Sequence, residues 1–178
     1  MQQVSHRLID KTLARLGRVP ADKIGLCLDR WEARQPNIIR YLLHAGDYLP
    51  ERCASSLIHL FWIIAESTQG LAELSTVSDE LIVRAHEANL LALGDIEPSH
   101  PEWETRMTEH FASFRQMPLL AFAFSVFDSE DACALDVDEM EPGVLAIKTV
   151  LDCLDLISHT PSRGVARLNR GKSDQKGT

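Results

Sequence analysis

The sequence predicts an all-α fold, a compact irregular bundle of about seven to eight helices with short connections. Apolar residues recur along its 178 residues at the i, i+3, i+4, i+7 spacing that places side chains on one helix face. One such run is Ile24, Cys27, Leu28 and Trp31. Strand-like alternation occurs clearly only over residues 121–127, where the alanines and the preceding Pro118 favour a buried helix instead.

The first four helices are predicted near residues 3–16, 21–34, 37–46 and 51–74. The second, third and fourth each begin after a proline, because the first turn of a helix does not need the N–H that proline lacks. These prolines are Pro20, Pro36 and Pro50. The first and third helices end near Gly17 and Gly46, where we expect the left-handed backbone that glycine adopts readily.

The last four helices are predicted near residues 79–93, 101–116, 119–127 and 143–158. The segment 76–80 offers Ser78 and Asp79 as caps for the first of these helices. Gly94 follows its apolar run and is expected to end it. The other three helices begin close to Pro101, Pro118 and Pro142.

Length and charge limit the class of protein. The chain length predicts one helical domain, residues 1–158, with a basic, flexible tail over 159–178. The net charge of −8 is unevenly distributed: +3 over residues 1–56, −15 over 57–158 and +4 over the tail. This acidic body argues against nucleic acid as a partner except through the tail. It also suggests that the basic ends lie against the acidic middle.

The cysteines and the amino-terminal segment indicate a compartment. The four cysteines form no C-x-x-C pair, and a chain of this size needs no disulfide framework. The first residues are polar and lack the apolar core of a signal peptide, and the longest apolar stretches are too short to span a membrane. We therefore expect a cytoplasmic protein without membrane contact.

Candidate catalytic residues are few, and motifs for phosphate binding, nucleophilic serine or zinc hydrolysis do not occur. The candidates are His59, Glu66 and His110. His59 and Glu66 are seven residues apart and so share a helix face, where a histidine–carboxylate pair could perform acid–base chemistry. The alternative is that this stripe faces water and that His110 is a satisfied core histidine. We predict no metal and no cofactor.

Three features could bind a partner. Trp62 could anchor a partner helix, although a core position is the alternative. The acidic segment 128–141 contains Asp128, Glu130, Asp131, Asp136 and Asp138, and could receive a basic partner or remain a solvated loop. The tail carries Arg163, Arg167 and Arg170 at helical spacing, which could bind phosphates or carboxylates or belong to a frayed terminus.

Two functions remain open. The leading prediction is a protein–protein interaction or regulatory module without catalytic activity, which uses a helix face and the acidic segment to bind another protein or a second copy of itself. The alternative is a small-molecule-binding or hydrolytic protein with a histidine and glutamate pocket. Its candidate residues are His44, His59, Glu66, His86 and His110.

Overall fold

The computed structural model describes residues 1–68, 75–94, 114–129, 133–135 and 137–159. Within these ranges every regular element is a helix, so the predicted all-α bundle is confirmed. The helices are α1 (His6–Leu16), α2 (Ala21–Arg34), α3 (Pro36–Gly46), α4 (Glu51–Ser67), α5 (Asp79–Gly94), α7 (Met117–Asp128) and α8 (Val137–His159). The helix predicted near 101–116 lies almost wholly outside the described residues.

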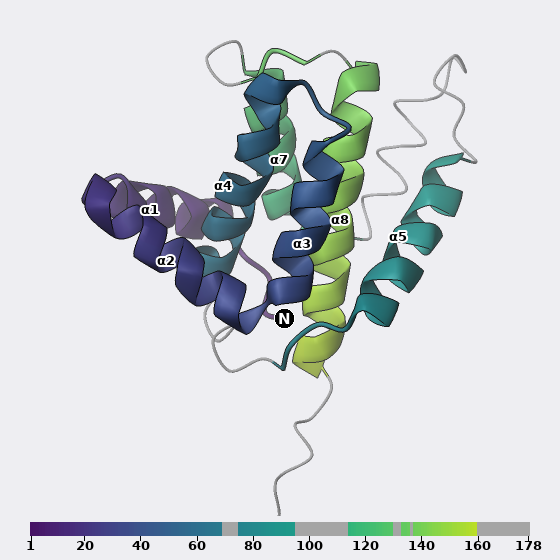
Figure 1. Ribbon diagram of the computed structural model, residues 1–178, viewed down its shortest axis with the longest axis horizontal. Helices are drawn as coiled ribbons and strands as arrows, with labels where there is room; N and C mark the ends of the chain where they lie inside the picture. Colours follow the sequence, from purple (N-terminus) through teal and green to yellow (C-terminus); the bar gives the residue numbers. More distant parts are fainter. Residues whose placement is uncertain (69–74, 95–113, 130–132, 136, 160–178) are drawn as a thin grey trace, which may run out of the picture.

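The long helix α8 is the centre of the bundle, and α3, α4, α5 and α7 all contact it (Figure 1). Residues 143–151 of α8 are buried without interruption. The fully buried side chains around it come from several helices and include Ile38, Leu42, Phe61 and Phe127. Removing this apolar surface from water is the main force that holds the helices together.

The two sides of the bundle differ in how they are attached. On one side, α1 packs on α4 and α2 on α3, and Trp31 of α2 meets Phe61 of α4 edge-to-face at 6.1 Å. On the other side, α5 packs extensively on α8 but only lightly on α3 (Figure 1). Helices α3 and α5 therefore both pack on α8 but are separated from each other along much of their length.

Three predicted helix ends are wrong. Helix α4 ends at Ser67 because Thr68 has an extended backbone and its hydroxyl donates to the Ile64 carbonyl at 2.8 Å. Helix α8 begins at Val137, not near 143, and Pro142 lies inside it. Helix α1 begins at His6, not near residue 3, although it ends at Leu16 as predicted. The left-handed backbone expected at Gly17 and Gly46 does not occur, because Gly17 has a right-handed backbone (φ −62°) and Gly46 is the last residue of α3.

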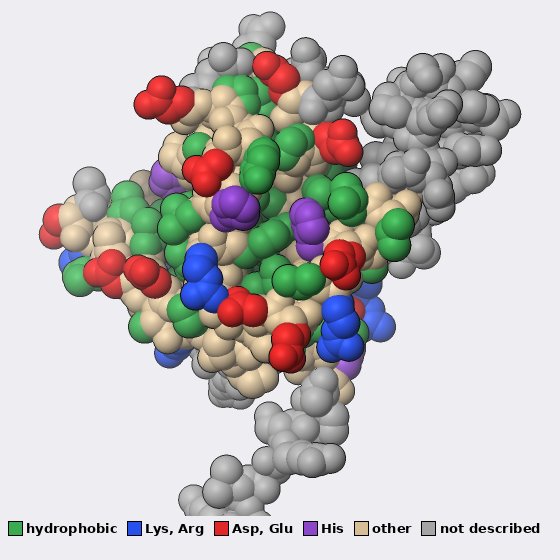
Figure 2. All heavy atoms as spheres, turned by 45° about the vertical axis from the view of Figure 1, so that its right-hand side comes forward, with side chains coloured by type: hydrophobic (Ala, Val, Ile, Leu, Met, Phe, Trp, Pro, Cys, Tyr) green, Lys and Arg blue, Asp and Glu red, His purple; other side chains and the backbone are tan. Residues whose placement is uncertain are grey.

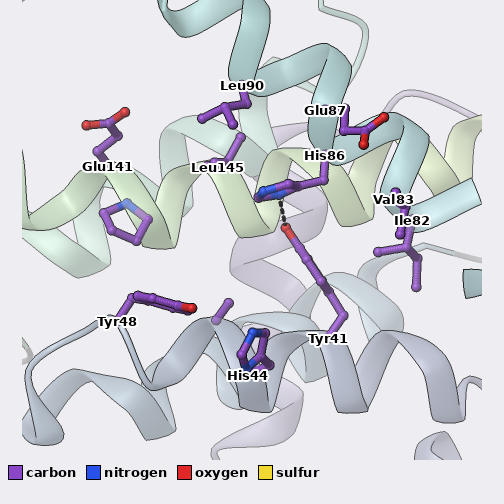
Figure 3. A pocket seen from close by; sticks show the side chains of 12 residues that line it. Tyr41, His44, Tyr48, Ile82, Val83, His86, Glu87, Leu90, Glu141 and Leu145 are labelled. Atoms are coloured by element: carbon purple, nitrogen blue, oxygen red, sulfur yellow. Dashed lines mark hydrogen bonds between the residues drawn. The ribbon is translucent and has the colours of Figure 1, made fainter.

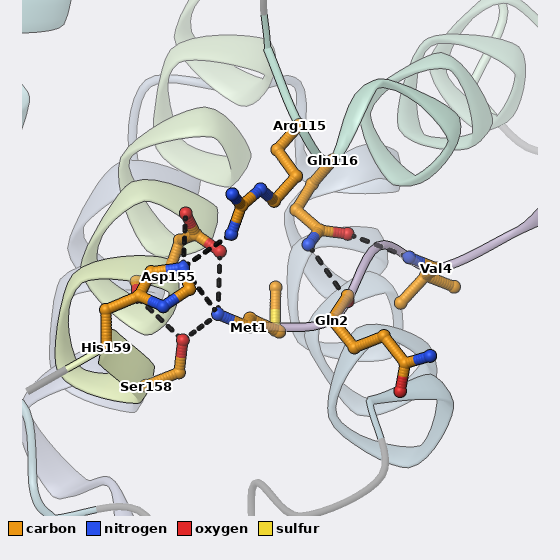
Figure 4. Close-up of polar contacts among 8 residues, drawn as sticks. All are labelled: Met1, Gln2, Val4, Arg115, Gln116, Asp155, Ser158 and His159. Atoms are coloured by element: carbon orange, nitrogen blue, oxygen red, sulfur yellow. Dashed lines mark hydrogen bonds and ion pairs between the residues drawn. The ribbon is translucent and has the colours of Figure 1, made fainter. Parts of the chain in front are cut away.

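The amino-terminal segment lies along the end of α8 (Figure 4). The Met1 amino group is 2.9 Å from Asp155 Oδ1 and also contacts Ser158 and the ring of His159. Gln116 holds the segment further along, because its side-chain amide accepts from Val4 N at 3.1 Å and donates to the Gln2 carbonyl at 3.1 Å. Helix α1 then begins after Ser5, whose hydroxyl caps Leu8 N.

No helix in the described parts of the chain combines the length and the apolar character that a membrane crossing requires.

Candidate functional site

A groove opens where α3 and α5 stand apart, and its volume is about 610 Å³ (Figures 2 and 3). Helix α3 forms one wall, α5 forms the other, and the beginning of α8 closes the floor with Leu145. The lining residues are mostly apolar or aromatic: Tyr41, His44, Ala45, Tyr48, Ile82, Val83, His86, Glu87, Leu90, Glu141, Pro142 and Leu145. We refer to this site as the α3–α5 groove.

A polar pair bridges the two walls of the groove. The Tyr41 hydroxyl lies 2.9 Å from His86 Nδ1, and the two rings meet edge-to-face with their centroids 5.8 Å apart (Figure 3). Burial raises the pKa of Tyr41, although a hydrogen bond with Thr149 partly opposes that rise. The hydroxyl therefore stays protonated near neutral pH and acts as a hydrogen-bonding group.

The hydrogen bonds continue from the groove into the bundle. Asn89 of α5 donates to Thr149 Oγ1 at 3.3 Å and to Asp152 Oδ2 at 2.8 Å. Lys148 donates to Asn89 Oδ1 at 2.7 Å and to the same Asp152 oxygen at 2.8 Å. These contacts satisfy a buried amide and a buried ammonium group, which would be costly to leave unpaired. They fix α5 against α8 behind the groove.

The buried thiol of Cys153 lies one residue beyond this cluster. Burial, with a smaller contribution from the charge of Asp152, raises the pKa of Cys153 to about 12. A thiol with such a pKa is protonated and unreactive at neutral pH.

The other end of the groove is more exposed. Tyr48 leaves 67% of its surface open to solvent, and its ring meets the ring of His44 edge-to-face at 5.5 Å. His44 Nδ1 is 3.5 Å from Asp47 Oδ2. Figure 2 shows histidine and hydrophobic side chains gathered on the face that contains the groove, with acidic side chains among them.

The structure brings together only some of the residues that the sequence offered for a histidine and glutamate pocket. His44 and His86 line the same groove. His59 is exposed on α4 and its Nδ1 lies 3.1 Å from the carbonyl of Ser55 in the same helix. His110 lies outside the described residues.

Glu66 belongs to a structural ion-pair cluster on the far side of the bundle. Its carboxylate accepts from Arg15 at 2.8 Å, from Arg30 at 3.0 Å and from the Trp31 indole at 3.2 Å. Burial alone would raise the pKa of Glu66, but the hydrogen bonds from Arg15 and Trp31 and the charges of both arginines outweigh it, and the pKa is lowered. Glu66 therefore joins α1, α2 and α4, and it does not line the groove.

The predicted partner-binding residues have separate locations. Trp62 is buried, with 5% of its surface exposed, and its indole N–H has no hydrogen bond to a described residue. Asp128 is exposed at the end of α7. Glu130, Asp131, Asp136, the side chain of Asp138 and the tail arginines Arg163, Arg167 and Arg170 lie outside the part of the chain that the structure describes.

Sequence reasoning missed most of the groove, although a signal was present. Tyr41, His44 and Ala45 follow the i, i+3, i+4 spacing and share one face of α3, and Tyr48 continues this spacing just beyond the end of the helix at Gly46. Ile82, His86 and Leu90 repeat every four residues on α5. Each pattern alone indicates a face that packs in the core. Only the separation of the two helices turns these faces into groove walls.

Among the described residues, histidine, cysteine and carboxylate side chains do not form a group of three that could hold a metal ion. Compared with protein-family models, curated proteins and solved structures, the chain matches none.

Proposed function

We propose that this protein is a non-catalytic binding domain that takes a small molecule with an apolar body into the α3–α5 groove. The observation that carries the proposal is the groove itself, a concave site with a volume of about 610 Å³ and mostly apolar and aromatic walls. Binding sites for small molecules have volumes of roughly 300–1,000 Å³ and combine apolar walls with a few polar groups that orient the ligand. The Tyr41–His86 pair supplies such polar groups.

The chemistry of the polar groups favours binding over catalysis. The Tyr41 hydroxyl has a raised pKa and is hydrogen-bonded to His86. His44 is directed to Asp47, and the carboxylate of Glu66 is engaged elsewhere. General acid–base catalysis needs a base that can lie within hydrogen-bond distance of a reacting group. Each of the two groove histidines instead contacts a partner of its own in the protein, Tyr41 for His86 and Asp47 for His44. The four free cysteines support a reducing compartment such as the cytoplasm.

The test uses naphthylmethanol, a neutral aromatic probe, with binding measured by calorimetry. We expect saturable one-to-one binding by the full chain. Ala45→Phe places a ring inside the groove and should weaken binding at least about tenfold, since a bulky group that occupies a pocket excludes the ligand. Ala14→Phe makes the same change at an exposed position of α1 and should leave binding unchanged.

A second variant covers the case in which Ala45→Phe disturbs the fold. Leu90 is a groove residue with 48% of its surface exposed, so Leu90→Gln should fold normally and weaken binding several-fold by removing an apolar contact. Equal binding by the wild-type chain, Ala45→Phe and Leu90→Gln would refute the proposal.

The exposed rim of the groove favours a second candidate, association of two copies of this chain. Tyr48, Val83 and Leu90 expose 67%, 52% and 48% of their surfaces. Several exposed apolar side chains along the rim of one groove are typical of an interaction surface. Sedimentation velocity over a range of protein concentrations tests this candidate: a dimer that Leu90→Lys dissociates would support it, and a monomer at all concentrations would exclude it.

A further inference from the structure

The charged residues of the α3–α5 groove are of one sign. Glu87 of α5 and Glu141 of α8 line it, whereas the described residues of its lining include no lysine or arginine. Both carboxylates are exposed, and neither forms an ion pair within the described residues. In this they differ from Glu66 and Asp79, whose carboxylates are engaged by arginines. The groove therefore presents unneutralised negative charge beside an apolar surface.

The aromatic residues add to the same preference. Tyr48 exposes most of its ring at the open end of the groove, and Tyr41 lies further in (Figure 3). The face of a tyrosine ring is electron-rich and attracts ammonium groups within about 6 Å. Glu141 and Tyr48 lie at the same end of the groove, and Glu87 lies toward its other end (Figure 3). Negative charge and an exposed tyrosine ring thus flank an opening that a cation with an apolar body would fit.

An anionic ligand would meet the opposite conditions. Recognition of a carboxylate or phosphate usually relies on arginine, lysine or several backbone N–H groups. Among the residues that the structure describes, the groove lining offers no arginine or lysine, and the two glutamates would repel such a ligand. The segment that supplies α5 and α8 belongs to the strongly acidic middle of the chain, with a net charge of −15 over residues 57–158.

From these observations we propose that the natural ligand of the groove is an organic amine in its ammonium form, attached to an aromatic or aliphatic body. The body would fill the space between Ala45, Leu90 and Leu145, and the ammonium group would lie toward Glu141 at the end of the groove that Tyr48 occupies, with Glu87 adding negative charge further along the groove (Figure 3). This inference rests on the proposed function, because it names the class of ligand for the same groove.

The test compares three probes with the same ring system: naphthylmethylamine, which is cationic at neutral pH, neutral naphthylmethanol and anionic naphthoate. At an ionic strength of about 0.01 M, where screening is weak, we expect the amine to bind about fivefold more tightly than the alcohol, and naphthoate to bind more weakly than either. This preference should shrink at about 0.15 M salt, since exposed charges are screened.

Two double variants separate local from overall charge. Glu87→Gln/Glu141→Gln should reduce the preference for the amine over the alcohol to less than about twofold, since each exposed carboxylate contributes only a few-fold. Glu32→Gln/Glu80→Gln removes the same charge at exposed positions outside the groove lining and should keep the preference. Binding of naphthylmethanol should be the same in all three proteins.

The outcomes distinguish this inference from the proposal on which it depends. If naphthylmethanol binds and Ala45→Phe abolishes its binding, but the amine and naphthoate bind equally well, the groove is a binding site and the ammonium assignment is wrong. If none of the three probes binds saturably, the proposed function fails. Loss of the amine preference in the Glu32→Gln/Glu80→Gln control would also overturn the assignment.

Discussion

The hydroxyl of Tyr41 and Nδ1 of His86 lie 2.9 Å apart and connect the two walls of the α3–α5 groove. Helices α3 and α5 otherwise contact each other only lightly. This hydrogen bond therefore helps to set the width of the groove, and the network behind it, from Thr149 to Asn89 and Lys148, fixes α5 on α8.

Tyr41→Phe should destabilise the protein by about 1 kcal/mol, because it removes a hydroxyl that is hydrogen-bonded in a largely buried place while it keeps the ring. Urea unfolding followed by circular dichroism measures this change. Tyr48→Phe is the matched control: its side chain is 67% exposed, and the change should stay within about 0.5 kcal/mol. Equal effects of the two substitutions would contradict the role assigned to Tyr41.

Glu66→Gln should destabilise the protein by about 1 kcal/mol at neutral pH, because it removes the charge that holds Arg15 and Arg30. Thermal unfolding at several ionic strengths measures the effect, which should become smaller with added salt. Glu32→Gln, an exposed carboxylate in α2, should have little effect. A similar loss of stability in both variants would show that the pairing of Glu66 with Arg15 and Arg30 adds no more stability than an exposed carboxylate does.

The same residue predicts a pH dependence. Because the folded-state pKa of Glu66 is below its ordinary value of 4.5, its charge stabilises the fold fully above that ordinary value, and this contribution is lost as the pH falls through the folded-state pKa. The difference in free energy of unfolding between the wild-type protein and Glu66→Gln should therefore stay constant from pH 7 down to about 5 and decrease as the pH is lowered below the ordinary pKa of 4.5. A constant difference down to the acid limit of folding would be inconsistent with the lowered pKa.

Two glycine substitutions should have opposite effects. A Cβ atom at Gly143 of α8 would lie 2.7 Å from Cζ of the buried Phe127 ring, so Gly143→Ala should cost about 1–3 kcal/mol of stability. Gly25 of α2 has open space around it, and Gly25→Ala should add about 0.5–1 kcal/mol because alanine favours the helix. Melting temperatures of both variants test this contrast, and a stabilised Gly143→Ala would show that α8 and α7 are not packed this closely.

The cysteines should react unequally. Cys27 is only half-buried, whereas Cys53, Cys133 and Cys153 are buried, and the pKa of Cys153 is raised to about 12. Iodoacetamide should therefore modify Cys27 first in the native protein, and Cys153 should react only after denaturation. Peptide mass spectrometry identifies the modified residues. Rapid modification of Cys153 under native conditions would contradict its burial against α5.

The sequence was sufficient to predict the fold class, because helical periodicity is a local property. The bounds of α2 follow directly from Pro20 and the apolar run that begins at Ile24. The uneven charge was also informative: Arg15 and Arg30 pair with Glu66, and Arg40 pairs with Asp79, so the basic first third contacts the acidic middle. Where local signals competed, as at Pro142 inside α8, the prediction of the boundary failed.

The groove could not be predicted from the same signals. His59 and Glu66 share a helix face by spacing, but spacing does not say what packs on that face, and α1 and α2 bring arginines to Glu66. His44 and His86 belong to the predicted pocket and do line one groove, but the sequence could not separate them from His59 and Glu66, since their proximity depends on how α3 and α5 pack on α8. Such packing is set by contacts between residues that are far apart in the chain.

An amide correlation spectrum recorded during a titration with naphthylmethanol would show whether the α3–α5 groove accepts an apolar group. We expect saturable shifts for groove residues such as Ala45, Val83, Leu90 and Leu145, with the signals of Ala14 and Gly25 unchanged. Saturable shifts at other sites alone, or no saturable shift at any signal, would contradict the proposed function.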